Sequence, residues 1–280
     1  MQVVKHIDDV RAVRWADPTL TWGLVPTMGT LHEGHPSLVR RARAENDRVG
    51  VSIFVNPIQF DRRADLDAYP RRLEQDRALL EAEGVDLIWA PDEDIMYPPD
   101  FQTYVDVEEV TQVLEGAARP GHFRGVTTVV NKLFNVFQPT RAYFGQKDAQ
   151  QVAVIRQMVR DLAMNLDVVV CPIVREDDGL ALSSRNLLLS PEQRIAGLVL
   201  SRALKAAASE WRAGNREADH LRATMTTTIE AEPLARIDYV SAADPISLQE
   251  LTGEVERALL SMAVFIGQIR LIDNMLIGMD

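Results

Sequence analysis

Short apolar runs alternate with amphipathic helical patterns through the first part of the chain, and this alternation restricts the fold more than any other feature. Five runs are expected to be strands: Thr21–Val25, Val49–Val55, Val85–Trp89, Arg141–Phe144 and Asp167–Cys171. Four segments between them have the pattern of helices: Ser37–Glu45, Arg71–Glu83, Val126–Phe137 and Ala149–Ala163. The alternation predicts an α/β fold, a mostly parallel sheet with helices on both faces, whose ligands bind beyond the carboxyl ends of the strands.

The pattern changes near Val174. Ser190-Pro191-Glu192 is a strong helix start, with serine as the cap and proline in the first position. Helices are expected over Glu192–Arg212 and Glu217–Glu230, and strands over residues 237–241 and Met262–Ile272. We therefore expect a smaller α+β domain over residues 176–280, joined to a first domain over residues 1–175.

Composition excludes several functional classes. A net charge of −11 and a pI near 5.0 argue against nucleic acid as a partner, since nucleic-acid binding usually requires a basic surface. The single cysteine, Cys171, excludes an intrachain disulfide and is expected in the core, because it lies in an apolar run. No long uncharged apolar stretch is present, so we expect no membrane insertion and a cytoplasmic location.

The first expected strand runs into the segment PTMGTLHEGH, Pro26–His35, which a helix follows. Backbone N–H groups at a helix N-terminus lack intrahelical partners, so this turn is suited to a phosphate. Its two glycines allow close approach of a ligand, and His32 and His35 add donors that can carry charge. Solvated histidines or metal ligands are the alternatives, although the other histidines (His6, His122 and His220) form no zinc-binding pattern with this pair.

Two later turns also carry groups suited to phosphates. In Gly145–Asp148, Lys147 could neutralise phosphate charge and Asp148 could cap the next helix or accept from a ribose hydroxyl. Leu182–Asn186 places two serines beside Arg185, which suits a departing pyrophosphate on a mobile loop. Ordinary turn chemistry would explain both segments as well.

Two further segments suggest a pocket for a small acid. Val55–Phe60 offers the neutral amides of Asn56 and Gln59, which suit a hydroxy acid, although Asn-Pro is also a common turn. Arg119–Gly125 is a basic glycine-containing loop that either adds charge to the cleft or is a plain connection. The glutamines that open the helix after Asp148 are typical of solvated positions, although one could face the cleft.

Taken in order, these segments resemble the pantoate–β-alanine ligase family over nearly the whole chain. The resemblance rests on PTMGTLHEGH, VNPIQF, RPGHFRGV, YFGQKDAQQ and REDDGLALSSRN. The H-x-G-H turn alone also occurs in nucleotidylyl transferases and class I aminoacyl-tRNA synthetases, whereas the ordered set is specific. The resemblance implies ATP-dependent amide formation between pantoate and β-alanine through a pantoyl-adenylate, with release of AMP and pyrophosphate. It also implies a Rossmann-like N-terminal domain, a hinged C-terminal lid, Mg²⁺ bound with ATP, and a homodimer.

The same resemblance implies roles for individual positions. His35 is expected to be the catalytic proton donor. The expected ATP-binding residues are Met28, Gly29, Thr30, Leu31, His32, Glu33, Gly34, His35, Gly145, Gln146, Lys147, Asp148, Val174, Leu182, Ser183, Ser184 and Arg185. Gln59 and Gln151 are expected to bind pantoate, with Gln59 also near β-alanine and His122 lining the same cleft. No protein ligand to a metal is implied, because Mg²⁺ is expected to bind through the ATP phosphates.

Four positions differ from the residues commonest in the family, namely Thr30, Pro36, Ile58 and Gln146. None of these differences removes a group assigned to the chemistry. Two alternative functions stay open. A nucleotidylyl transferase would use the same turn without needing the Asn56 and Gln59 pocket, and a non-catalytic adenylate-binding sensor would bind ATP but release no AMP.

Overall fold

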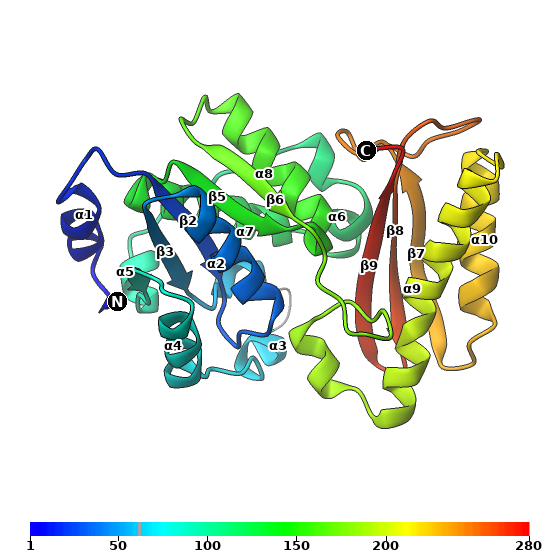
Figure 1. Cartoon of the computed structure of the whole chain (residues 1–280), viewed down its shortest axis with the longest axis horizontal. Coiled ribbons are helices and arrows are strands. Elements are labelled where there is room, and N and C mark those ends of the chain that lie inside the picture. Colours follow the sequence, from blue (N-terminus) through cyan, green and yellow to red (C-terminus); the bar gives the residue numbers. More distant parts are fainter. Residues whose placement is uncertain (61–62, 280) are drawn as a thin grey trace.

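The main sheet has six parallel strands in a computed structural model that describes residues 1–60 and 63–279 (Figure 1). The strands are β1 (Gln2–Val4), β2 (Trp22–Thr27), β3 (Arg48–Ile53), β4 (Leu87–Trp89), β5 (Arg141–Gly145) and β6 (Asp167–Cys171). They lie in the order β1-β4-β3-β2-β5-β6. From β2 the chain adds β3 and β4 on one side and then β5 and β6 on the other side, while β1 lies at the edge beside β4. The expected fold class is confirmed, while the short edge strand β1 is not among the expected strands.

Helices cover both faces of this sheet. They are α1 (Ile7–Trp15), α2 (Gly34–Glu45), α3 (Arg63–Asp67), α4 (Leu73–Ala82), α5 (Glu93–Met96), α6 (Leu114–Ala118), α7 (His122–Phe137) and α8 (Ala149–Asp161), with 3-10 turns η1 (Pro57–Gln59), η2 (Glu109–Thr111) and η3 (Gln146–Asp148). Successive strand residues point to opposite faces. Leu24 packs with the core under α7 and α8, whereas Val25 packs with the core under α2 and α4. Cys171 is buried in the second of these cores, as expected.

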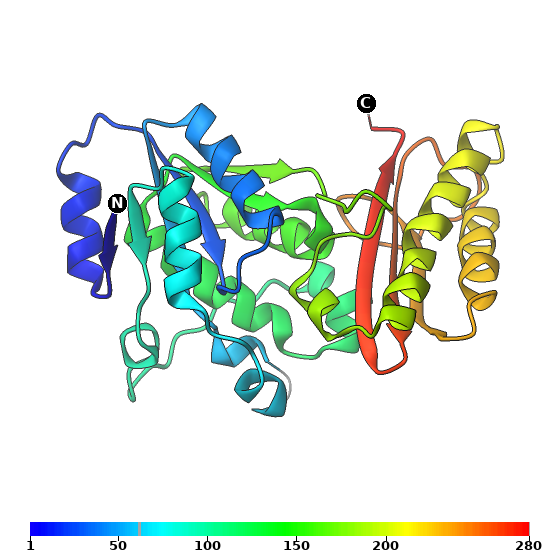
Figure 2. The same ribbon diagram turned by 60° about the horizontal axis from the view of Figure 1, so that its bottom comes forward.

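The C-terminal part forms a second, antiparallel sheet in the order β7-β8-β9. Its elements are η4 (Ser184–Leu188), α9 (Pro191–Arg212), α10 (Ala218–Glu230), β7 (Ala235–Ala243), β8 (Ala258–Ile266) and β9 (Ile269–Ile277). Helices α9 and α10 lie on the side of this sheet that faces away from the main sheet (Figures 1 and 2). Leu259 of this sheet belongs to the apolar core that includes residues of α7 and α8, and Leu276 packs against that core. The boundary between residues 175 and 176 stays a prediction.

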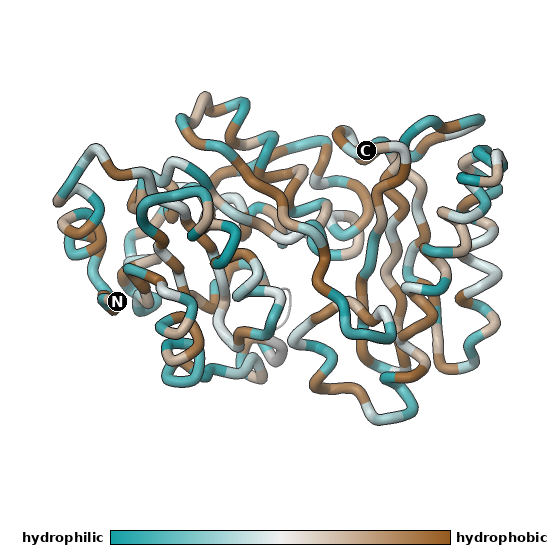
Figure 3. Tube along the Cα trace, viewed as in Figure 1, coloured by the Kyte–Doolittle hydropathy of each residue, from teal (hydrophilic) through white to brown (hydrophobic). Residues whose placement is uncertain are grey.

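Hydrophobic residues concentrate along the strands, and hydrophilic residues lie on the outer helical surfaces (Figure 3). One strand expected from such periodicity is wrong. Met262–Ile272 is not a single strand, because the chain reverses after Ile266 and β9 begins at Ile269. Gly267 adopts a φ of 60°, the left-handed conformation that a tight hairpin requires and glycine accommodates. The apolar alternation continues on both sides of the turn and so conceals it.

Helix α9 begins as expected. Ser190 is its N-cap and Pro191 its first residue. The Ser190 hydroxyl accepts a hydrogen bond from the Gln193 N–H at 3.3 Å, and the Gln193 side chain accepts one from the Ser190 N–H at 3.0 Å. This reciprocal pair satisfies two backbone donors that the helix itself leaves without partners.

Replacing the cap should destabilise the protein. We expect Ser190→Ala to lower the free energy of unfolding by about 1 kcal/mol, because it removes the acceptor for the Gln193 N–H. Urea denaturation followed by circular dichroism measures this change. Ser209→Ala, at an exposed position of the same helix, is the matched control and should change stability by less than about 0.5 kcal/mol. Equal stabilities of the two variants would contradict the capping role.

Candidate active site

Two of the expected turns meet where the strand order reverses. Strands β2 and β5 are neighbours, and both are followed by turns at their carboxyl ends, Met28–His35 after β2 and η3 after β5. Lys147 and Asp148 of η3 lie close enough to His32 and His35 to influence the pKa of both rings. Crevices at such reversal points are the usual ligand sites of open α/β sheets.

The two histidines form a compact pair. Their ring centroids are 4.4 Å apart. Nδ1 of His32 accepts a hydrogen bond from the Gly34 N–H at 3.2 Å, so in the neutral ring the proton is on Nε2. Nδ1 of His35 lies 3.3 Å from both the N–H and the carbonyl oxygen of His32. The turn thus orients both rings through its own backbone.

Both histidines are neutral near pH 7. Burial lowers the pKa of His32 to about 4, and the nearby His35 and Lys147 contribute further. Burial also lowers the pKa of His35, against the opposing effects of the His32 carbonyl and Asp148. The capacity of these rings to carry charge is therefore not used at this pH. They can donate hydrogen bonds as neutral imidazoles.

The expected row of unpaired N–H groups at the start of α2 is not found either. The His35 N–H donates to the His32 carbonyl at 2.8 Å, and the Ser37 N–H donates to the Glu33 carbonyl at 3.2 Å. The Gly34 N–H is bound by the His32 ring, as described above. Because these N–H groups already have acceptors, the imidazole rings are the groups of this turn that are better placed to bind a ligand.

A buried carboxylate holds this turn from outside. Asp76 of α4, 3% exposed, accepts hydrogen bonds from the N–H groups of Thr30 and Leu31, each at 2.8 Å. Thr30 has a φ of 55°, which is strained for a residue with a side chain, and its hydroxyl donates to the Pro70 carbonyl at 2.8 Å. The sequence reasoning missed Asp76. Its burial could have been inferred from the helical period, because Asp76 lies four residues before the fully buried Leu80 on the same face of α4.

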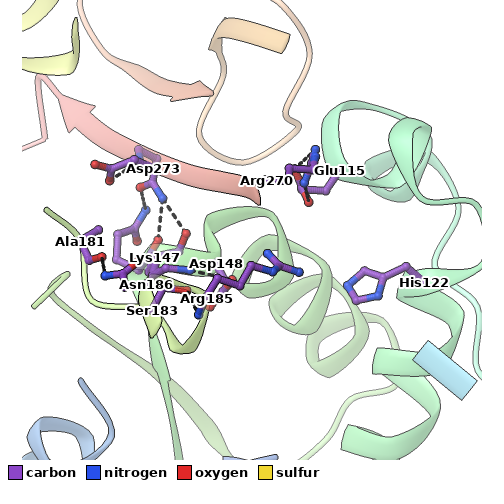
Figure 4. Close-up of polar contacts among 12 residues, drawn as sticks. Glu115, His122, Lys147, Asp148, Ala181, Ser183, Arg185, Asn186, Arg270 and Asp273 are labelled. Carbon is purple, nitrogen blue, oxygen red and sulfur yellow. Dashed lines mark hydrogen bonds and ion pairs between the residues drawn. The ribbon is translucent and has the colours of Figure 1, made fainter. Parts of the chain in front are cut away.

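Cationic groups gather beside the histidines. The Lys147 ammonium lies 3.8 Å from the Asp148 carboxylate. Burial, with nearby Arg119, lowers the pKa of Arg185, and no ion pair to Arg185 occurs within the described residues. The Ser183 hydroxyl caps η4 by accepting from the Arg185 N–H at 3.2 Å. A small cavity at the junction is lined in part by Lys147, Ser183, Arg185, Asn186, Arg270 and Asp273, whereas His122 lies apart from Lys147 (Figure 4).

The expected acid pocket adjoins the histidine turn. The Gln59 amide nitrogen lies 3.1 Å from the Met28 sulfur, and Asn56 donates to the Gln59 amide oxygen at 2.9 Å. Gln151 is half-buried in the first turn of α8, and its amide makes no hydrogen bond within residues 1–60 and 63–279. The neighbouring Gln150 is structural, because it is 5% exposed and its amide binds the backbone of residues 110–115.

The C-terminal sheet contacts the site through β9. The Asn274 amide donates to the carbonyl groups of Gln146 and Lys147 at 3.0 and 2.9 Å, and accepts from the Gln146 amide at 3.1 Å. Arg270 forms a bidentate ion pair with Glu115 of α6, with N···O distances of 2.7 and 2.8 Å (Figure 4). The Asn274 contacts hold η3 from the second sheet, and the Arg270 pair holds α6 from the same sheet. The residues that form these contacts lie in no recognisable sequence motif, so they were not predicted from the sequence.

The third expected ATP segment folds back on its neighbour. The Leu182 N–H donates to the Val174 carbonyl at 3.0 Å, while the Val174 N–H has no acceptor within the described residues. Burial raises the pKa of Tyr69, and the Ser184 hydroxyl beside it opposes that rise. The Ser183–Arg185 loop therefore reaches across to the segment that precedes α4.

Neither a metal cluster nor a membrane span occurs in the described part of the chain. No group of three or more His, Cys, Asp or Glu side chains there could hold a metal ion. No helix there combines the length and apolar character needed to cross a bilayer.

Comparison with known proteins identifies the family. The sequence profile of the family described as pantoate-beta-alanine ligase matches residues 2–276. The chain is 61% identical to the pantothenate synthetase of Roseiflexus sp. (strain RS-1), over 98% of each chain. It is 58% identical to that of Herpetosiphon aurantiacus, over 98% of this chain and 99% of the relative.

Solved structures agree with this result. The crystal structure of pantothenate synthetase from Thermus thermophilus superposes with a TM-score of 0.93 at 48% identity, covering 98% of this chain and 99% of that one. Pantoate-beta-alanine ligase from Francisella tularensis, complexed with β-γ ATP and β-alanine, gives a TM-score of 0.81 at 36% identity, covering 99% and 97% of the two chains. The chain belongs to the pantoate–β-alanine ligase family.

Proposed function

We propose that this chain condenses pantoate with β-alanine through a pantoyl-adenylate, using ATP and releasing AMP and pyrophosphate. The observation that carries the proposal is the contact between Met28 and Gln59, which joins the histidine turn to the acid pocket. A carboxylate is a poor acylating agent, so it must first be activated. In this site an acid beside Gln59 would lie next to the nucleotide phosphates. The ligands in the Francisella ligase, β-γ ATP and β-alanine, agree with the proposal.

Adenylation requires charge stabilisation. When the carboxylate attacks the α-phosphate, negative charge builds on the phosphoryl oxygens and on the departing pyrophosphate. We assign that stabilisation to Lys147, to Arg185 with Ser183 and Ser184, and to the N–H groups of the neutral histidines. His35 stays our proposed proton donor, in the sense that its neutral ring would donate a hydrogen bond to the phosphoryl oxygens. The Lys147 backbone and the Ser183 hydroxyl already have partners, which limits the reorganisation that they need during the reaction.

Amide formation requires positioning and exclusion of water. The neutral amine of β-alanine attacks the acyl carbon and displaces AMP. Gln59 and Gln151 are the proposed pantoate ligands, and Gln59 also lies on the proposed path of the amine. The Ser183–Arg185 loop contacts Tyr69 across the cleft and is placed to limit hydrolysis of the mixed anhydride. Orientation of the amine can supply several kcal/mol of the second step.

Magnesium, dimerisation and location extend the proposal. Mg²⁺ usually binds through one or two carboxylates together with substrate phosphates and water, and does not need a cage of protein ligands. The described residues fit that mode, because Asp148 lies beside Lys147 and no larger acidic cluster is present among them. Bound Mg²⁺ would neutralise phosphate charge. We also propose a homodimer, which rests on the family resemblance alone, and a cytoplasmic location, which rests on the composition of the sequence.

The ligase proposal predicts partial reactions. Pyrophosphate should exchange into ATP when pantoate is present and β-alanine is omitted, and AMP release should require all three substrates. His35→Ala should slow the exchange by about 10²–10³-fold, the usual effect of removing one preorganised donor. Isotope exchange with labelled pyrophosphate measures the exchange rate in the unmodified protein and in His35→Ala.

His220→Ala is the matched control for this experiment, because His220 lies on the exposed face of α10 and should leave exchange unchanged. Near-normal exchange in His35→Ala would refute the role of His35. Absence of exchange in the unmodified protein would refute the adenylate. An adenylate-binding sensor would release no AMP under any condition, and a nucleotidylyl transferase would instead yield a dinucleotide-like product, which mass spectrometry distinguishes.

The buried histidine pair predicts a pH dependence of stability. The pKa of His32 is about 4 in the folded protein against an ordinary value of 6.5. Between these values the unfolded chain binds a proton that the folded protein excludes, so the free energy of unfolding falls as pH falls through this window. We expect His32→Asn to reduce that slope, measured by urea denaturation at several pH values. Above pH 7 the two curves should run parallel; equal slopes below pH 6 would show that His32 is not held neutral.

A further inference from the structure

We propose that Asn56 is a positioning residue, which fixes the Gln59 side chain so that its N–H groups, and not its oxygen, face the acid substrate. The inference deepens the proposed function and rests on it, because it takes Gln59 to contact pantoate. It concerns the polarity of the pocket, which decides what substrate groups the pocket accepts.

The Gly125 carbonyl oxygen fixes the orientation of the Asn56 amide. The Gly125 carbonyl oxygen can only accept a hydrogen bond, and one terminal atom of the Asn56 amide lies 3.0 Å from it. That atom must be the nitrogen, which fixes the orientation of the amide. The amide oxygen then faces the Tyr97 hydroxyl at 2.8 Å. Burial raises the pKa of Tyr97, so the hydroxyl keeps its proton and donates.

The second N–H of Asn56 transmits this orientation to Gln59. The Asn56 nitrogen lies 2.9 Å from one terminal atom of the Gln59 amide, and that atom must be an acceptor. It is therefore the oxygen. The Gln59 nitrogen takes the opposite side, 3.1 Å from the Met28 sulfur. A thioether is a weak acceptor, and the nitrogen has no other acceptor within residues 1–60 and 63–279.

The backbone of Gln59 is held as firmly as its side chain. Its carbonyl oxygen lies 2.9 Å from Nδ1 of His122, which must carry the proton, and it also accepts from Arg119 at 3.3 Å. Gly125 lies directly against η1, because a Cβ at that position would meet the Ile58 carbonyl oxygen at 2.5 Å. His122 thus supports the main chain of Gln59, in addition to its place beside the cleft.

The environment of Asn56 makes this orientation costly to reverse. Asn56 is 1% exposed, so reversing its amide would set its oxygen against the Gly125 carbonyl with no water to compensate. Gln59 consequently offers a donor to the substrate. The matching substrate group is an acceptor oxygen of the hydroxy acid, either its carboxylate or a hydroxyl. Sites that hydrogen-bond a substrate in this way discriminate strongly against analogues that lack the group.

Two variants test the proposal kinetically. Asn56→Asp keeps the shape of the side chain but removes both donors, so Gln59 loses its fixed orientation. In pantoate-dependent pyrophosphate exchange we expect the KM for pantoate to rise at least about tenfold while the KM for ATP changes less than about twofold. Tyr97→Phe is the matched control, because it removes a hydrogen bond to the same asparagine but leaves the Gly125 contact intact.

The control should lower thermal stability yet keep the KM for pantoate within about twofold of the unmodified protein. Equal increases in both variants would mean that Asn56 acts only through general stability, and the proposal would be wrong. Absence of exchange in the unmodified protein would overturn the proposed function instead, so the two failures are distinguishable.

A direct measurement covers the case in which Asn56→Asp does not fold. In the unmodified protein, the proposal expects a nuclear Overhauser contact between the Gln59 amide protons and the Met28 methyl group. Selective labelling of glutamine nitrogen and methionine methyl carbon isolates that signal. Contacts of these protons with the Asn56 side chain, without one to Met28, would show the reverse orientation and overturn the inference.

Discussion

The reversal of strand order between β2 and β5 is the constraint on which the rest of the structure depends. Because β2 pairs with both β3 and β5, the chain leaves the centre of the sheet in two directions. The connections on the two sides then diverge and leave a crevice at the carboxyl ends of the strands. The histidine turn and η3 enter this crevice from neighbouring strands. Residues more than a hundred positions apart in sequence thereby lie at the same edge of the sheet.

A second principle is that the proposed reactive groups are oriented by buried polar partners. Asp76 holds the backbone before the histidines, Asn274 holds the backbone of Lys147, and Asn56 holds Gln59. Asp76 and Asn274 come from other elements than the groups they hold, whereas Asn56 is the N-cap of the turn that contains Gln59. Each of the three is almost fully buried. Burial makes these hydrogen bonds selective, because an unpaired buried group costs about 1–3 kcal/mol. The same burial keeps the two imidazoles neutral.

Much of the fold was predictable from local pattern. Strand β6 occupies the predicted residues Asp167–Cys171, and α9 starts at its predicted cap, because apolar periodicity and capping chemistry are local properties. Strand β1 was not predictable, since three residues carry too little periodicity. The turn at Gly267 was concealed by apolar residues on both sides.

The motifs of the candidate site were predictable from the sequence. The buried residues that hold these motifs in place were not. The segments Met28–His35, Val55–Phe60 and Gly145–Asp148 reach the same edge of the sheet, because each follows one of the neighbouring strands β2, β3 and β5. Their role in binding stays a prediction. The roles of Asp76 and Asn274 depend on contacts between distant elements, which no single segment records. The neutrality of His32 and His35 likewise depends on burial by the whole fold and not on the turn itself.

The apolar seam between the two sheets has an evolutionary consequence. Leu259 and Leu276 pair across β8 and β9, yet both pack with the apolar core of the main sheet. A change of side-chain volume at either leucine is therefore felt in both halves of the chain. We therefore expect substitutions at Leu259 or Leu276 to be accompanied in evolution by compensating substitutions in the core that they contact. A chimaera that takes its C-terminal half from a relative would need the residues of this shared cluster in the first half from the same parent.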